Sequence, residues 1–150
     1  MPDDLEQLYR ARFDDFLRIA RAITHDDGQA HDAVQETFVR ALRGRASFRG
    51  DGPLEAWVWG ILVNVARSTR RVLPHPTAAD AASREPAVDG EFRRWVAELP
   101  ERQRLVVFLR YWVDLDYRSI ATALGIEIGT VSATLNAAHA ALRRALKEVS

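Results

Sequence analysis

The spacing of the apolar residues constrains this 150-residue chain most, because in two blocks they recur every three or four positions. That period places them on one face of an α-helix, which makes a turn in about 3.6 residues. No stretch alternates between apolar and polar residues convincingly enough for a β-strand. The sequence therefore predicts an all-α fold.

The first block predicts three helices. One carries apolar residues from Leu5 to Ile23, and the next runs from Ala30 to Leu42 with Leu42 on its apolar face. A polar, glycine-containing loop follows from Arg45 to Gly52. Pro53 then suits the first turn of a third helix, because its missing amide hydrogen has no helical partner there. We expect this helix to run to about Arg71.

The second block also predicts helices. Pro100 can open the first of them, and the next runs from Tyr117 to Leu124. Asp114 or Asp116 can accept hydrogen bonds at its start, and Gly125 can close it. The last helix is expected from about residue 129 to residue 149, with Leu142 and Leu146 on its apolar face.

Two of these helices have the spacing of a helix-turn-helix. In that motif a small residue lets the second helix approach, a glycine makes the turn, and a β-branched residue packs back. Ala121, Gly125 and Val131 stand at these positions. A generic helical hairpin is the alternative that spacing alone leaves open.

The stretch between the blocks contains three of the six prolines and few large apolar side chains. Such a stretch buries too little surface to offset the entropy of ordering it. We therefore expect two small helical domains, residues 1–72 and 91–150, joined by a flexible linker over residues 73–90.

Composition excludes several classes of site. The chain has no cysteine, which excludes disulfides, a thiolate nucleophile and Cys-ligated metals. Its four histidines are scattered, and it has neither a glycine-rich phosphate loop nor a nucleophile elbow. We predict no enzyme, metal or cofactor. The acidic start and the short apolar runs predict neither a signal peptide nor membrane insertion.

Three motifs together resemble bacterial sigma factors. Residues 99–111, 117–126 and 129–131 look like the fourth conserved sigma region. Residues 30–41 resemble the second-region helix that grips core RNA polymerase, and residues 56–67 resemble the helix that reads the −10 promoter element. Their order and the short linker fit the extracytoplasmic-function (ECF) group. The resemblance covers nearly the whole chain.

The resemblance implies a cytoplasmic, nucleoid-associated protein that directs core polymerase to promoters. Its partners would be promoter DNA, the polymerase β′ coiled coil and β flap, and an anti-sigma factor. The resemblance assigns contact with the coiled coil to Asp32, Gln35, Glu36 and Phe38. The first three share one helix face, a polar patch that could meet arginines of a partner.

The resemblance also implies residues that read the −10 element. The loop 47–53 corresponds to one that captures a flipped base, so Phe48 and Arg49 would hold that base and its phosphate. Phe48 plugging the core is the alternative. Asn64 would read a base edge. Trp57 and Trp59 are two residues apart and cannot share a helix face. Trp57 stands at the tryptophan position of the family, so the resemblance implies that it lies in the core and that Trp59 is partly exposed toward DNA or a partner. The phosphate-holding residues would be Arg67, Arg70 and Arg71.

The region that would contact the −35 element departs from the family pattern. No basic residue follows the turn until Arg143, and Glu127 and Ile128 replace the usual serine cap. Fewer cations mean fewer phosphate contacts and a weaker grip on DNA. The residues left to contact the −35 element are Arg118, Thr130, Ser132, Thr134, Asn136 and Arg143.

Three interpretations follow. The chain is a sigma factor that depends mainly on its −10 domain, or a sigma-like protein that binds polymerase or an anti-sigma partner with weak DNA affinity. The third is a stand-alone helix-turn-helix regulator. The motif from Asp32 to Phe38 argues against the third, which has no use for a polymerase-docking helix. The first interpretation is favoured.

Overall fold

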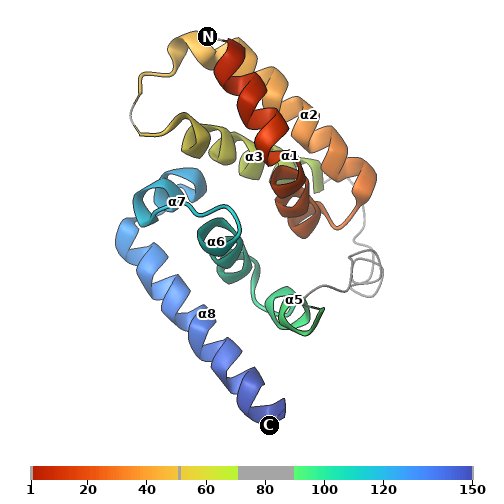
Figure 1. Ribbon diagram of the computed structural model, residues 1–150, viewed down its shortest axis with the longest axis vertical. Coiled ribbons are helices and arrows are strands. Elements are labelled where there is room, and N and C mark those ends of the chain that lie inside the picture. The colour runs from red at the N-terminus through yellow and green to blue at the C-terminus, as the bar shows by residue number, and fades with distance from the viewer. Residues whose placement is uncertain (1, 51, 71–89, 150) are drawn as a thin grey trace.

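The computed structural model describes residues 2–50, 52–70 and 90–149, and within these ranges the chain is helical and contains no strand. The all-α prediction is confirmed. The helices form two domains, with α1, α2 and α3 in the first and α5, α6, α7 and α8 in the second (Figure 1). The expected linker over 73–90 lies almost wholly outside the described residues.

The first domain packs three helices around an aromatic stack. They are α1 (Pro2–Thr24), α2 (Asp27–Gly44) and α3 (Leu54–Arg70), with a short 3-10 turn η1 at Arg45–Ser47. The rings of Phe16 and Trp59 stack with centroids 4.0 Å apart, and both side chains are fully buried. Phe38 packs edge-on against Phe16 at 5.2 Å. This cluster joins all three helices.

The second domain comprises α5 (Gly90–Ala97), α6 (Glu101–Tyr111), α7 (Tyr117–Leu124) and α8 (Ile128–Val149). Between α7 and α8, Gly125 is left-handed with φ 67°, a conformation that glycine adopts without steric cost. The Ile126 amide donates to the Ala121 carbonyl at 3.0 Å, and Val131 is fully buried. The helix-turn-helix is therefore present, with the predicted small residue, turn and β-branched contact.

The two domains pack directly against each other. α3 lies along α7, and α1 lies beside α6, so one hydrophobic core runs through both domains (Figure 1). α3 crosses α7 at Gly60, where an added Cβ would lie 3.4 Å from the Ala123 carbonyl oxygen. The two backbones therefore approach closely at position 60, where glycine has no side chain. The sequence did not predict this docking.

Several details differ from the sequence predictions. Leu42 and Leu146 are 56% and 53% exposed, although both were expected on apolar faces. Leu42 lies at the edge of its helix face, where the neighbouring Ala41 takes the buried position. Leu146 lies near the end of the 22-residue α8. This helix extends beyond the 11-residue α6 that packs on it, so its last turns are exposed. Helix α5 was not predicted at all.

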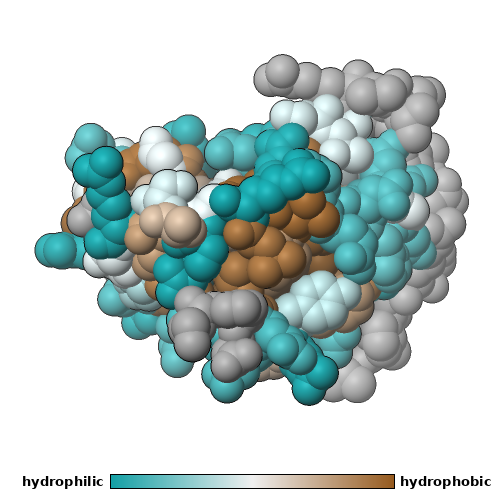
Figure 2. All heavy atoms as spheres, turned by 90° about the horizontal axis from the view of Figure 1, so that it is seen from above, coloured by the Kyte–Doolittle hydropathy of each residue, from teal (hydrophilic) through white to brown (hydrophobic). Residues whose placement is uncertain are grey.

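The end of the molecule where α1 begins and α2 ends exposes apolar surface among hydrophilic side chains (Figure 2). Val39 and Leu42 are the large apolar residues that α2 exposes. Among the described residues, no single helix is both long and apolar enough to cross a membrane. Helices α7 and α8 pass that test only as a pair bent by 100°, on length and composition alone.

The cap of α7 makes a prediction about stability. The Ser119 amide donates to Asp116 Oδ1 at 2.8 Å, and this bond, with a further one to the Ser119 side chain, lowers the pKa of the Asp116 carboxyl. Asp116→Ala should therefore cost about 1 kcal/mol in the free energy of unfolding at pH 7, measured by chemical denaturation.

The pH dependence of that loss distinguishes the cap from a packing effect. A carboxyl whose pKa is lowered by folding contributes fully to stability above its ordinary pKa of about 4. This contribution is lost as the pH falls through the lowered pKa of the folded protein. Asp116→Asn should keep the cap at pH 7 but remove this acid-dependent component. Equal stability of Asp116→Ala and the parent at pH 7 would contradict the assignment.

Candidate nucleic-acid interface

The predicted polymerase-docking residues lie on the outer face of α2. Asp32 and Gln35 are exposed, and Glu36 is half-buried. The Gln35 amide donates to the Tyr9 hydroxyl at 3.0 Å, and Glu36 pairs with Arg40 at 2.8 Å. These contacts hold two of the three side chains in place on one polar face.

Phe38 is not part of that face. It is 7% exposed and lies in the core between Tyr9 and Phe16, with ring centroids at 4.9 and 5.2 Å. The prediction that Phe38 contacts the polymerase coiled coil directly is therefore wrong. Because Phe38 is only two residues from Glu36, it faces the opposite side of the helix and supports the polar face from beneath.

The loop before α3 seats its aromatic residue on that helix. Phe48 is half-buried against Trp57 with centroids 5.1 Å apart, and the Arg45 guanidinium lies 5.7 Å above its ring. Arg49 is exposed. Gly50 and Gly52 have φ of 80° and 104°, a backbone shape that favours glycine at both positions. The loop thus places Phe48 and Arg49 beside the start of α3.

The two tryptophans of α3 are placed opposite to the prediction. Trp59 is fully buried on Phe16, and its indole N–H donates to Glu55 at 3.2 Å. Trp57 is half-buried at the rim, under Phe48 and beside Gly44. The prediction that Trp59 is partly exposed toward DNA or a partner is wrong, because the stack on Phe16 places position 59 at the centre of the core.

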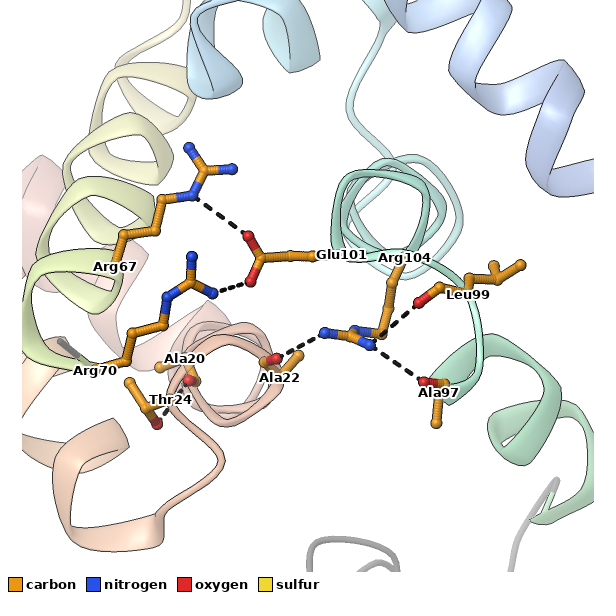
Figure 3. A network of polar contacts seen from close by, with 9 residues as sticks. All are labelled: Ala20, Ala22, Thr24, Arg67, Arg70, Ala97, Leu99, Glu101 and Arg104. Atoms are coloured by element: carbon orange, nitrogen blue, oxygen red, sulfur yellow. Dashed lines mark hydrogen bonds and ion pairs between the residues drawn. The ribbon is translucent and has the colours of Figure 1, made fainter. Parts of the chain in front are cut away.

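The predicted −10 residues farther along α3 divide into exposed and paired groups. Asn64 is exposed, so its amide is accessible to a base edge. Arg67 and Arg70 are half-buried and both contact Glu101 of the second domain (Figure 3). Arg71 lies outside the described residues.

The predicted −35 residues lie on α7 and α8. Thr130, Ser132 and Thr134 are half-buried, and Asn136 and Arg143 are exposed. Ile128 is 45% exposed, as its place at the missing cap suggested. The exposed face at the start of α8 consists of small or neutral residues, namely Gly129, Ala133, Asn136 and Ala137.

Arg118 of α7 lies near the loop that precedes α3. It lines an open hollow together with Ser119 and Thr122 of its own helix and Gly52 and Pro53 of the loop. A residue assigned to the −35 element and the loop assigned to the flipped base therefore meet in this structure. No group of three or more His, Cys, Asp or Glu in the described part of the chain is placed to hold a metal.

Sequence reasoning missed Glu101 and Arg104, which connect the domains. Arg104 donates to the Ala22 carbonyl of α1 at 3.0 Å and to Ala97 and Leu99 carbonyls at 3.2 and 3.3 Å (Figure 3). Burial lowers the pKa of its guanidinium, while the charge of Glu101 raises it. Glu101 is 31 residues from Arg70, so no local spacing signals their contact.

Comparison with known proteins agrees with the fold. Residues 8–72 match the family described as Sigma-70 region 2, and residues 89–149 match Sigma-70, region 4. The structure thus defines a class of protein in which a helical Sigma-70 region 2 domain is followed by a helix-turn-helix domain of region 4. The chain belongs to the ECF group of the sigma-70 family of RNA polymerase sigma factors.

Individual relatives cover most of the chain. The ECF RNA polymerase sigma factor SigM of Mycobacterium tuberculosis is 34% identical over 94% of this chain and 76% of its own length. The RNA polymerase sigma-H factor of Pseudomonas aeruginosa is 30% identical over 82% of this chain and 76% of its own. The fold is similar to that of sigma factor RpoE from Bartonella quintana, solved with the anti-sigma factor NepR. In that comparison the TM-score is 0.74 at 22% identity, over 96% of this chain and 97% of the other.

The reversed placement of the tryptophans predicts unequal effects on stability. Trp59→Ala removes one ring of the central stack and should lower the free energy of unfolding by about 3–5 kcal/mol. Trp57→Ala removes a rim residue and should cost clearly less. Equilibrium denaturation followed by circular dichroism measures both, and a larger loss for Trp57→Ala would contradict the described core.

Proposed function

We propose that this sigma factor directs core RNA polymerase to promoters through separate faces of its first domain. The proposal assigns polymerase docking and −10 recognition to residues 1–72, a tether to residues 73–90, and −35 contact to residues 91–150. The observation that carries it is that Asp32 and Gln35 are exposed on α2 while Asn64 is exposed on α3. Polymerase and DNA would therefore bind to different helices.

The α2 face suits a basic partner. Asp32 and Glu36 supply carboxylates four residues apart, and Gln35 adds an amide held by Tyr9. Carboxylates at this spacing can accept charge-assisted hydrogen bonds from arginines on a facing helix. The β′ coiled coil of core polymerase is the partner that we assign to this face.

The α3 face and the preceding loop suit unpaired promoter DNA. Phe48 offers a ring for stacking, Asn64 offers a donor and an acceptor, and Arg67 and Arg70 follow with guanidinium groups for phosphates. Unstacking a base costs a few kcal/mol, which such contacts offset. Binding energy would then open the −10 element, with no nucleotide hydrolysis by this chain.

The second domain is proposed to contribute less to promoter affinity. The exposed residues at the start of α8 include no cation, and each missing phosphate contact removes about one unit from the salt dependence of binding. Thr130, Ser132, Thr134 and Asn136 would supply hydrogen bonds, with Arg118 and Arg143 on phosphates. The β flap of polymerase is the further partner that we assign to this domain.

A second candidate function is a sigma-like regulator that acts mainly by binding protein partners. The neutral face of α8 favours it, because a domain with little affinity for DNA can still bind polymerase or an anti-sigma factor. The RpoE structure with NepR supports proposing an anti-sigma partner here. In either case we place the protein in the cytoplasm, at the nucleoid.

The docking assignment predicts loss of polymerase binding in one double variant. Asp32→Ala with Gln35→Ala should abolish co-elution with core polymerase on gel filtration while leaving the fold intact, since both side chains are exposed. Asp14→Ala, at an exposed acidic position of α1, is the control and should co-elute normally. Normal co-elution of the double variant would defeat the docking assignment.

The base-reading assignment predicts a change in promoter preference. Asn64→Ala should reduce discrimination at one −10 position by about 1–3 kcal/mol if the amide makes a bidentate base contact. Transcription from a library randomised at the −10 element measures the ranking. Ser68→Ala, exposed one turn farther along α3, should leave it unchanged. An unaltered ranking with Asn64→Ala would remove this residue from the site.

A further inference from the structure

The contact between α3 and the second domain involves the same side chains that the proposed function assigns to DNA phosphates. Glu101, in the first turn of α6, faces the end of α3, where its carboxylate hydrogen-bonds Arg70 and lies 3.6 Å from the Arg67 Nε (Figure 3). The three side chains are 24–34% exposed. One carboxylate thus engages two guanidinium groups from the other domain.

A DNA phosphate at this place would contact the same two guanidinium groups that contact the Glu101 carboxylate. A carboxylate and a phosphate both present anionic oxygens that guanidinium groups bind in the same way. While Glu101 contacts Arg67 and Arg70, its single negative charge offsets part of their combined positive charge, and its carboxylate accepts a hydrogen bond from Arg70. Promoter phosphate and Glu101 are therefore alternative ligands for the same two arginines.

Two further polar contacts hold the domains in this arrangement. Arg104 donates to the Ala22 carbonyl in the last turn of α1, a carbonyl that has no helical partner. Arg12 of α1 donates to the Val113 carbonyl at 3.1 Å, just after α6. Water can replace either guanidinium at its carbonyl, so these contacts can be exchanged when the domains separate.

The two domains fit closely where α3 crosses α7. Gly60 faces the backbone of Thr122 and Ala123 on α7, so small groups meet at the crossing point. α7 covers this side of α3, the helix that carries Asn64. DNA that approaches α3 from this side would need α7 and α6 to move away.

We propose that the second domain inhibits DNA binding by the first, with the Glu101 carboxylate taking the place of promoter phosphate on Arg67 and Arg70. This inference rests on the proposed role of these two arginines in DNA binding. The apparent affinity for DNA is then reduced by the fraction of molecules that are closed. Separation of α6 and α7 from α3 frees the cations.

The test measures binding of the full chain to a fluorescein-labelled oligothymidylate of about 20 nucleotides, which offers phosphates without sequence readout. Glu101→Gln removes the carboxylate charge and should tighten binding by about three- to tenfold, as expected for loss of two partly exposed ion pairs. Glu98→Gln is the matched control at an exposed position near α6 and should leave affinity unchanged. Equal affinities for the Glu101 and Glu98 variants would overturn the inference.

A second variant distinguishes failure of the inhibitory contact from failure of the proposed phosphate-binding role of the two arginines. Arg67→Ala with Arg70→Ala, added to Glu101→Gln, should abolish the gain in affinity. If the arginine substitutions weaken binding but Glu101→Gln does not strengthen it, the phosphate role stands and the inhibitory contact is wrong. If the arginine substitutions have no effect, both proposals fail.

Domain opening has its own readout. The chain has no cysteine, so Gln7→Cys on α1 and Arg144→Cys on α8, both exposed, provide the two sites for fluorescent dyes. Saturating oligothymidylate should lower the energy transfer between them, because the domains move apart. Binding that leaves the energy transfer unchanged would overturn the inference.

Discussion

The close crossing of α3 and α7 at Gly60 is the constraint on which the domain arrangement depends. Without a side chain at position 60, the two backbones approach until an added Cβ would touch the Ala123 carbonyl at 3.4 Å. That approach brings α6 beside the end of α3 and places Glu101 between Arg67 and Arg70. The ionic contacts then add to the close packing of α3 on α7 at Gly60.

Within the first domain, the aromatic stack decides which helix faces remain accessible. Trp59 on α3 lies over Phe16 on α1, and Phe38 on α2 closes the cluster edge-on. Because the core takes these three positions, Asp32 and Asn64 must point outward from their helices. The two faces that we assign to polymerase and DNA are thus fixed by one core, and a loss of that core would disturb both together.

Local chemistry in the sequence predicts most of this fold. The helix period, the Asp116 cap and the Gly125 turn are properties of neighbouring residues, and each is found where predicted. Trp57 and Trp59 were assigned in reverse, because spacing shows that they diverge but not which one meets Phe16. The pairing of Glu101 with Arg70 joins residues 31 apart in different domains, and a charge at a helix start gives no sign of such a partner. Docking depends on the shapes of both domains, which no local pattern records.

Transcription by purified core polymerase with this protein, on fragmented DNA of the organism that encodes it, tests the central claim most directly. The account predicts discrete 5′ ends that share an element near −10, with a weak or absent −35 consensus because α8 offers few cations to DNA. Addition of the Asp32→Ala, Gln35→Ala variant in place of the parent should eliminate these starts. Core polymerase that gives the same starts with and without the parent protein would contradict the account.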